Sequence, residues 1–400
     1  MAVVAAVGGG LTSCADDGAE STSAARGGSS AQQTGSMSSK STAESPSKSS
    51  KSSKSGASAG RVTIGASGDL LTHVAVRRSA EAYAGSAGHY DFRPMFAKVA
   101  PLIAKSDISI CHMETPIGEP GDIAGYAGKG PYGYNKILAP YELAGDLHRV
   151  GFDRCSTASN HANDLGTAGI GSTLDALDEA GIGHAGTART QAEAAPAAHL
   201  LTVNGVTVAH LSYARNSNSG WPAEDWRIDK AVTATKVVQD VAAARAAGAE
   251  VVIVSLHVFV EMQTGPTADD RTLVQQITSL ADVDLVLVTG PHVIQPYEQV
   301  NGTWVFWSLG NFISGMGVAN RGKYTDPRTL DGLMATARFT EQPDGSWLVE
   351  PWALLVCNVT GSRKVYPGIT TLQDPALGTT LRTQLHACVN RTLVVEPRVH

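Results

Sequence analysis

From Arg61 onward the chain alternates short, almost continuous apolar runs with longer amphipathic segments. The apolar runs predict buried strands at 61–71, 107–117, 152–161, 251–257 and 284–290. The amphipathic segments predict helices at 94–105, 139–151, 169–181, 230–247 and 267–281. Pro94 opens the first of these helices, and Gly151 and Gly181 end the next two. Because buried strands alternate with helices, the pattern predicts an α/β fold with partly parallel sheets.

Two Asn-Gly dipeptides interrupt this alternation. Asn204-Gly205 predicts a hairpin within 198–213, and Asn301-Gly302 predicts another between 297–300 and 303–309. Further strands are expected at 332–340 and 346–355. Hairpins interleaved with α/β units favour two mixed sheets packed together over one doubly wound sheet. The Gly- and Tyr-rich segment 118–135 lacks the spacing of a phosphate-binding loop, so it is expected to be a mobile loop; alternatively, it caps a substrate.

The first sixty residues have a different composition. Residues 1–60 contain no Phe, Trp or Tyr, and 15–60 contain 16 serines in 46 positions, which predicts a disordered linker. Ala2–Leu11 is apolar and uncharged, and Leu11-Thr12-Ser13-Cys14 resembles a bacterial lipobox, although the usual preceding basic residues are missing. We therefore expect a signal at 1–14, lipidation of Cys14 and a tether at 15–60. The alternative without a targeting role is a flexible terminus whose cysteine has no function.

This organisation leaves a folded domain at 61–355 and a C-terminal extension at 356–400 packed on it. The expected location is outside the cell, with a lipid anchor on the outer face of the bacterial membrane. Export would permit disulfides, and Cys357–Cys388 is the favoured pair because it would tie down the C-terminal segment. Cys111 and Cys155 are equally consistent with buried free thiols, so their state stays open. The net charge of −6 offers no overall attraction to nucleic acid.

Residues suited to metal binding or acid–base work stand where predicted strands end. In open α/β sheets ligands bind outside the carboxyl ends of the strands, so residues far apart in the sequence are expected to converge there. Carboxylates, imidazoles and an amide oxygen suit Mn, Fe or Zn better than a thiolate-selected metal. Residues 61–400 have neither a Gly-x-Ser-x-Gly elbow nor a His-Glu-x-x-His pair. The residues at the strand ends are Asp69, Glu114, Asn160, His161, His257 and His292.

Six short motifs occur in order along the chain: GDLLTH (68–73), HMETPI (112–117), SNHANDLG (159–166), HVFVE (257–261), GPHVIQP (290–296) and SLGNF (308–312). Together they resemble the CapA-type poly-γ-glutamate capsule-synthesis family, a branch of the calcineurin-like metallophosphatases, over residues 62–315. The resemblance implies a four-layer α/β/β/α sandwich, in agreement with two mixed sheets. It also implies work on an anionic cell-envelope polymer or its precursor, beside other capsule-synthesis proteins, with one or two divalent metal ions.

The same resemblance implies roles for individual residues. It makes His161 the imidazole that protonates a leaving group, and Asp164 the carboxylate that orients it. Two metal ions at such a site activate a water and neutralise an oxyanion. The implied metal ligands are Asp69, Glu114, Asn160, His257 and His292.

Three positions depart from the family pattern. His112 replaces an amide, and His257-Val258-Phe259-Val260-Glu261 replaces a His-Trp-Gly-x-Glu motif. Gly290 replaces the first imidazole of a His-Pro-His motif, so the site is expected to hold one metal, or two loosely. The residues considered as additional site members are His73, His112, Glu261 and Asn311.

Two hypotheses about function follow. The first is a lipid-anchored, metal-dependent hydrolase or phosphoesterase acting in capsule assembly; cleavage of a γ-glutamyl amide by the same site is a variant of it. The second is a non-catalytic partner of the capsule machinery that keeps the fold and binds or exports the anionic polymer.

Overall fold

The computed structural model describes residues 59–317 and 322–400. The expected signal at 1–14, its Cys14 and almost all of the expected linker at 15–60 lie outside the described residues. Lipidation, export and tethering therefore stay predictions. The division into a domain at 61–355 and an extension at 356–400 stays a prediction as well.

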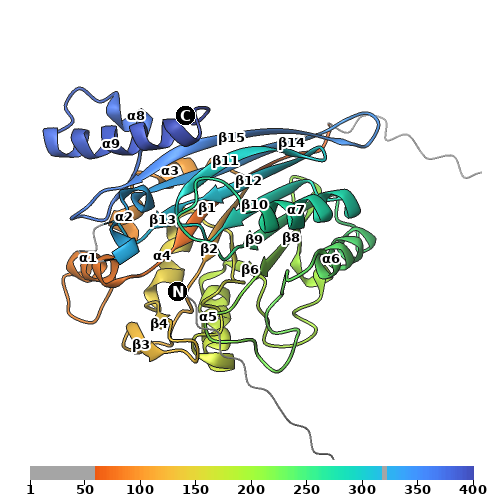
Figure 1. Cartoon of the computed structure of the whole chain (residues 1–400), viewed down its shortest axis with the longest axis horizontal. Coiled ribbons are helices and arrows are strands. Elements are labelled where there is room, and N and C mark those ends of the chain that lie inside the picture. The colour runs from red at the N-terminus through yellow and green to blue at the C-terminus, as the bar shows by residue number, and fades with distance from the viewer. Residues whose placement is uncertain (1–58, 318–321) are drawn as a thin grey trace, which may run out of the picture. The chain divides into compact units, whose positions relative to one another are not determined.

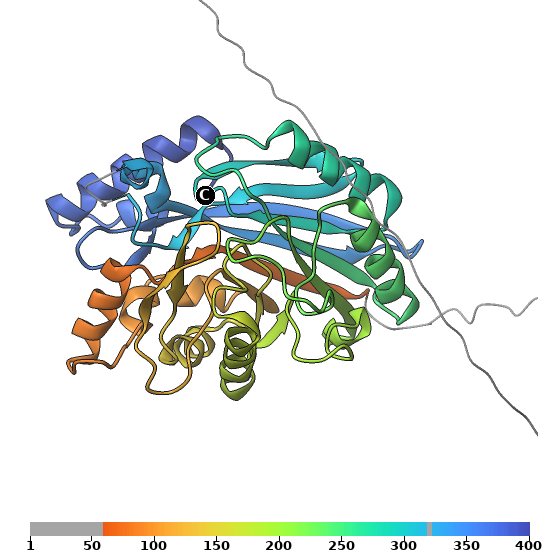
Figure 2. The same ribbon diagram turned by 60° about the horizontal axis from the view of Figure 1, so that its bottom comes forward.

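Two mixed β-sheets face each other in the described part of the chain (Figures 1 and 2). In the larger one, sheet I, β1, β2, β5 and β6 are parallel, while β14, β15 and β16 continue the sheet antiparallel; β13 pairs parallel with β1. In order, sheet I consists of β16 (Val365–Pro367), β15 (Trp347–Asn358), β14 (Asp331–Glu341), β1 (Arg61–Leu70), β2 (Ile108–Met113), β5 (Arg154–Ser156) and β6 (Gly183–Ala185), with β13 at Asn311–Ile313.

The second sheet, sheet II, has a parallel centre and antiparallel edges. Strands β12, β10, β9 and β8 run parallel, and β11 and β7 close the two edges as hairpin partners. In order, sheet II consists of β11 (Ile294–Val300), β12 (Thr303–Leu309), β10 (Leu285–Thr289), β9 (Val251–His257), β8 (Val206–Ala214) and β7 (Leu200–Val203).

Helices cover the outer face of each sheet. The helices packed on sheet I are α1 (Val74–Ala84), α2 (Arg93–Phe96), α3 (Ala100–Ile103), α4 (Glu142–Val150) and α5 (Gly166–Ala180). Those on sheet II are α6 (Ala234–Ala246) and α7 (Ala268–Leu280). The C-terminal helices are α8 (Gly368–Leu372) and α9 (Thr379–Val395), and the 3-10 turns are η1 (Pro196–His199), η2 (Gly322–Thr325) and η3 (Pro327–Leu330).

Strand β9 shows why the apolar runs are continuous. Side chains alternate across a strand, and both faces of β9 are covered. Val251 and Ile253 belong to the core between the two sheets, whereas Val252 and Val254 belong to the core beneath α6 and α7. The predicted four-layer α/β/β/α sandwich is confirmed.

Both predicted hairpins are confirmed, and their turns explain the Asn-Gly signal. Asn204 and Gly205 have φ values of 53° and 79°, and Asn301 and Gly302 have 51° and 87°. A tight hairpin turn with positive φ at both central residues favours Asn followed by Gly.

Two predictions were wrong. The helix expected at 94–105 is divided into α2 and α3, because Pro101 has no backbone N–H to donate to the turn before it. The loop expected at 118–135 contains β3 (Gly125–Lys129), which pairs with β4 (Asn135–Leu138) in a small separate hairpin. Most of the hairpin's residues are exposed or half-buried, so its sequence shows no apolar alternation.

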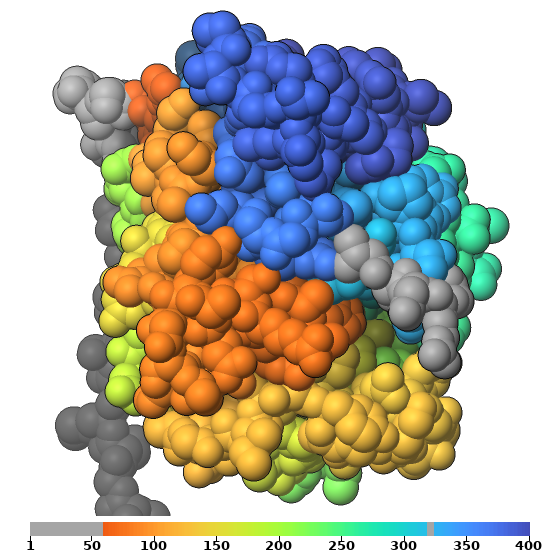
Figure 3. Space-filling model, turned by 90° about the vertical axis from the view of Figure 1, so that its left-hand side faces the viewer, coloured from red at the N-terminus to blue at the C-terminus, as the bar shows by residue number. Residues whose placement is uncertain are grey.

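The C-terminal helices pack beside sheet I and against the edge of sheet II. Helix α9 contacts β15 and β11, and its Cys388 forms a disulfide with Cys357 of β15, which confirms that predicted pair. A second disulfide joins Cys111 and Cys155 between β2 and β5. Figure 3 shows the C-terminal segment above α1 and the β3–β4 hairpin on one face of the molecule. No helix in 59–317 or 322–400 has the length and apolar character that a membrane crossing requires.

A buried ion pair attaches α9 to sheet I and yields a stability prediction. Arg391 donates from Nε and Nη2 to the two carboxylate oxygens of Asp331, at 2.7 and 2.6 Å, and Asp331 is only 2% exposed. Replacing Arg391 by Met leaves that carboxylate without its partner, so the free energy of unfolding should fall by about 3 kcal/mol. Urea denaturation measures this. The exposed Arg78→Met is the control, and equal stability of the two variants would contradict the assignment.

Candidate functional site

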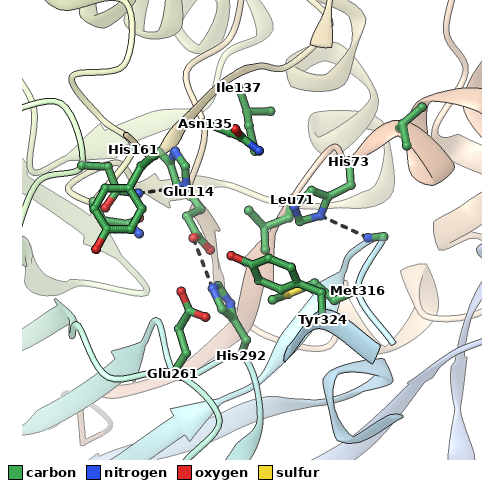
Figure 4. Close-up of a pocket in the computed structure, with 15 residues that line it drawn as sticks. Leu71, His73, Glu114, Asn135, Ile137, His161, Glu261, His292, Met316 and Tyr324 are labelled. Carbon is green, nitrogen blue, oxygen red and sulfur yellow. Dashed lines mark hydrogen bonds and ion pairs between the residues drawn. The ribbon is translucent and has the colours of Figure 1, made fainter. Parts of the chain in front are cut away.

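The carboxyl ends of the parallel strands of both sheets meet at one edge of the sandwich. Asp69 lies in β1, Glu114 follows β2, and His257 ends β9. Asn160 and His161 follow β5, and His292 follows β10. Four of these residues, Glu114, Asn160, His161 and His292, line a cavity of about 270 Å³, shown in Figure 4. Its lining includes His73, Glu114, Asn160, His161, Asn218, Glu261 and His292.

Two carboxylates lie fully inside the protein at this edge. Asp69 and Glu114 are 0% and 1% exposed. Neither carboxylate oxygen of Glu114 has a hydrogen-bond partner among the described residues, and the same is true of Oδ1 of Asn160. Burial raises the pKa of the Glu114 carboxyl well above its usual range. Buried oxygens left without donors are the atoms that a metal ion would satisfy.

His292 compensates the two carboxylates in this structure. Its Nδ1 lies 2.9 Å from Oδ2 of Asp69 and 3.1 Å from Oδ1 of Asn311, and its Nε2 lies 3.6 Å from Oε1 of Glu114. Burial alone would lower the pKa of His292, but the charges of Glu114 and Asp69 outweigh burial and raise it to about 10. His292 therefore supplies positive charge beside the two carboxylates.

Two further imidazoles are neutral. His112 Nε2 lies 3.0 Å from His257 Nδ1, and His112 Nδ1 lies 2.8 Å from the Ser156 hydroxyl. Burial lowers the pKa of His112 to about 4 and that of His257 well below its usual value. Neutral imidazole is the form that binds metal.

The residues present fit a divalent cation. Each of four residues offers one ligand atom, and these atoms lie within 4.8 Å of one another. The set combines two carboxylates with two imidazoles, which suits a borderline divalent metal. These four residues are Asp69, His112, Glu114 and His257.

His161 forms a dyad with Asp164 beside this group. Its Nδ1 lies 2.6 Å from Oδ2 of Asp164, and its Nε2 lies 3.4 Å from the side-chain nitrogen of Asn218. Asp164 is held in turn by the Ser219 hydroxyl at 2.8 Å and the backbone N–H of Ile137 at 3.0 Å. The carboxylate therefore fixes the ring so that Nε2 faces the cavity (Figure 4).

Gly290, where the resemblance implies an imidazole, has a backbone that requires glycine. Its φ is +103°, and a Cβ built there would lie 2.2 Å from the carbonyl oxygen of Val258. Its backbone N–H points at Oδ1 of Asp69, at 3.3 Å. An imidazole at position 290 is incompatible with this backbone, because both the φ value and the close approach require glycine.

The remaining predicted residues take different places. His112 joins the group of four, whereas His292 bridges Asp69 and Glu114 beside it. His73 and Glu261 line the cavity but are not members of the group. Asn311 accepts from His292 and donates to the backbone carbonyl of Thr329, so it positions the ring.

Sequence reasoning missed the loop after β8. Asn218 and Ser219 contact the dyad, yet a short Asn- and Ser-rich loop carries no signal that distinguishes it from other turns. It also missed Tyr324 in the cavity lining, whereas Tyr134 and Asn135 belong to the segment 118–135 that was considered as a cap over substrate. The place of His112 in the site could have been predicted from the period of two along a strand. His112 and Glu114 are two residues apart, so their side chains point to the same face at the end of β2.

The geometry can now be compared with known proteins. Residues 63–316 match the family model described as bacterial capsule synthesis protein PGA_cap, which covers more than half of the chain. The chain belongs to the PGA_cap family. The motifs that signalled this family supply Asp69, Glu114, His161 and His257 to the site.

Two relatives within capsule synthesis are similar over part of their length. The PGA biosynthesis protein CapA of Bacillus subtilis (strain 168) is 28% identical over 205 residues, which is 51% of this chain and 52% of that protein. The capsule biosynthesis protein CapA of Bacillus anthracis is 24% identical over 185 residues, 45% of this chain and 44% of that protein. The chain thus spans about half the length of the curated relatives it matches. The solved calcineurin-like phosphoesterase YfkN from Bacillus subtilis aligns with a TM-score of 0.40 and 11% identity, covering 84% of this chain and 98% of that one.

The backbone at Gly290 gives a direct prediction. Gly290→Ala should lower the free energy of unfolding by about 2–4 kcal/mol, because it adds both positive-φ strain and a clash. Gly171→Ala, in the middle of α5 with no atom within 4 Å of the added Cβ, is the matched control. It should instead raise stability by up to about 1 kcal/mol. Chemical denaturation compares the two, and a tolerated Gly290→Ala would show that this backbone is not required.

The protons on Glu114 and His292 predict how metal binding depends on pH. The pKa of each is raised in the metal-free site, so a bound cation must displace a proton. The pKa values of His112 and His257 are lowered, so they hold no proton to displace at neutral pH. Affinity for Zn²⁺ or Mn²⁺ should therefore rise with pH, by roughly tenfold per unit if one proton is released.

A competition titration with a metal indicator at pH 6.5, 7.5 and 8.5 measures this dependence. Glu114→Gln should weaken binding strongly, and the exposed Glu350→Gln should not. Binding that is undetectable, or equally tight at all three pH values, would contradict the metal assignment.

Proposed function

We propose that this PGA_cap protein is a metal-dependent hydrolase of the phosphoesterase type that acts in the assembly of an anionic cell-envelope polymer. One observation carries the proposal: Asp69 and Glu114 form a group with neutral His112 and His257, and Glu114 of this group lines the same cavity as His161 of the His161–Asp164 dyad. The buried Glu114 carboxylate has no hydrogen-bond donor among the described residues, which is costly unless a cation balances it.

The chain's own residues divide the chemistry between binding and proton transfer. Asp69, His112, Glu114 and His257 would hold the metal, with Asn160 and His292 beside them. When bound, a divalent metal polarises a phosphoryl oxygen and lowers the pKa of a bound water. Asp164 holds the Nδ1 edge of His161 and stabilises the ring when it carries a second proton. His161 Nε2 is then placed to protonate a leaving-group oxygen in the cavity.

The capsule context is proposed from the family and its relatives. Both relatives are named for capsule or PGA biosynthesis, which supports an anionic polymer or its precursor as the substrate class. The lipobox-like Leu11–Cys14 and the Ser-rich 15–60 support anchoring on the outer face of the membrane, beside other capsule-synthesis proteins. A 46-residue flexible tether of this kind spans roughly 35–40 Å on average.

Gly290 favours a second candidate, a non-catalytic polymer-binding partner. The position offers no imidazole, and its N–H and His292 both contact Asp69 in place of a metal. If the protein only binds polymer, retention of polymer at the cell surface should survive Asp69→Ala in a chain that still folds. Loss of polymer retention in that variant would rule out a purely polymer-binding role.

Hydrolysis by the full-length, detergent-purified chain tests the main proposal. With added Mn²⁺, cleavage of bis-p-nitrophenyl phosphate should be detectable, and His161→Ala should lower kcat by about 10²- to 10⁴-fold. The exposed His386→Ala on α9 is the matched control and should leave kcat unchanged. Metal content, measured on each variant, should match that of the wild type.

The outcomes separate the hypotheses. Metal-dependent cleavage that His161→Ala leaves intact would contradict the assigned dyad. A metal-loaded protein that cleaves a γ-glutamyl amide but no phosphodiester would keep the site and change the substrate. If the protein binds no metal and cleaves neither a phosphodiester nor a γ-glutamyl amide, the hypothesis that it is a hydrolase is refuted.

A further inference from the structure

His73 stands at an unusual place for a histidine. It occupies the N-cap of α1, where Ser, Thr, Asp or Asn commonly bond to the first helical N–H groups. Its side chain makes no such capping bond; instead, the ring lines the cavity that Glu114 and His161 also line. Its backbone performs the capping role, since its carbonyl accepts from Val76 N at 2.9 Å and Arg77 N at 3.1 Å.

One contact fixes which ring nitrogen carries the proton. The backbone N–H of Gly315 donates to Nδ1 of His73 at 3.3 Å, and the Ser314 hydroxyl lies 3.4 Å from the same atom. A backbone N–H can only donate, so Nδ1 must present its lone pair. The proton of the neutral ring is then on Nε2, on the edge turned away from Gly315 (Figure 4).

The Gly315 contact is built into the fold. A Cβ at Gly315 would lie 2.5 Å from Cβ of His73, so only glycine allows this approach. Arg363, itself 3% exposed, donates from Nη1 to the carbonyl of Ser314 at 3.0 Å and holds the loop. Arg77 donates to the carbonyl of Thr72 at 2.6 Å on the other side. The ring therefore lies between two segments, 314–315 and 72–73, and each is held by a hydrogen bond from an arginine.

The surroundings also oppose a second proton on the ring. Burial lowers the pKa of His73 to about 3, and the positive charges of His292, His161, Arg77 and Arg363 act in the same direction. His73 can thus neither serve as a general acid near neutral pH nor release its Nδ1 to a metal without losing the Gly315 bond.

We propose that His73 is a substrate-binding residue whose Nε2–H donates to an oxygen of the phosphoryl group bound in the cavity. It faces the same cavity as His161 but has a different role: His161 moves a proton, whereas His73 holds one in place. The assignment rests on the proposed phosphoesterase function for the identity of the substrate. It gives His73, considered above as an additional site member, a role in binding substrate rather than metal.

The tautomer is tested without catalysis. In full-length protein with ¹⁵N-labelled histidine, loaded with Zn²⁺, long-range ¹H–¹⁵N spectra should show His73 protonated at Nε2 only, between pH 5.5 and 8. The resonance is assigned by its loss in His73→Gln. A protonated Nδ1, or a second proton gained in this range, would overturn the proposal.

Variants at position 73 test the Nε2–H hydrogen-bond donor. His73→Leu removes it, and kcat/KM for bis-p-nitrophenyl phosphate should fall about 10- to 150-fold. His73→Gln can place an amide N–H near the Nε2 position and should recover most of this loss, whereas His73→Asn, which is one bond shorter, should not. Equal losses in all three variants would refute a hydrogen-bonding role.

Binding of inorganic phosphate to the Zn²⁺-loaded protein supplies a readout that needs no turnover. His73→Leu should weaken phosphate binding by a similar factor, with metal content unchanged. Loss of metal in this variant would make His73 a ligand and overturn the proposal. If the wild type hydrolyses no phosphodiester, the proposed function fails, but the tautomer and the phosphate titration still decide the role of His73.

Discussion

The burial of two carboxylates at the ends of adjacent parallel strands is the constraint on which the site depends. Asp69 and Glu114 lie inside the protein, where a charge without a partner is expensive. Sheet I supplies both, together with His112, and sheet II supplies His257 and His292 from the facing strand ends. The packing of the two sheets is therefore what brings the compensating imidazoles to the carboxylates.

Around this centre the imidazoles take three electrostatic roles. His292 lies against both carboxylates, and its pKa is raised because their charges outweigh its burial. His112 and His257 are neutral, because burial lowers the pKa of each. His73 is also neutral, but the Gly315 N–H determines which nitrogen keeps the proton. The same side-chain type can thus act as a compensating cation, a metal ligand or a hydrogen-bond donor according to its neighbours.

Much of this arrangement was predictable from sequence, because strand ends are local features, and the family resemblance implied the pairing of Asp164 with His161 that the structure contains. Asp69, Glu114, Asn160 and His161 were placed by position along buried strands, and the structure brings them to one edge. Two mixed sheets followed from hairpins interleaved with α/β units, and the four-layer sandwich was implied by the family resemblance. Gly290 was recognised as a missing imidazole, but its positive φ and its N–H to Asp69 are backbone features that residue identity alone does not reveal.

The failures have equally physical causes. Pro101 divides the expected helix at 94–105, since a missing N–H outweighs helical apolar spacing. The β3–β4 hairpin escaped notice because it buries little on either face. The predicted helices omitted α1, whose N-cap is a histidine rather than a usual capping residue, and with it the fixed orientation of His73. Asn218 and Ser219 reach the dyad only through tertiary contact.

Anomalous diffraction from crystals of the protein grown with Mn²⁺ tests the central claim most directly. The account predicts an anomalous peak bounded by Asp69, His112, Glu114 and His257, with His292 released from its contact with Glu114. A site that stays without a peak at saturating Mn²⁺, with His292 still between the two carboxylates, would contradict it.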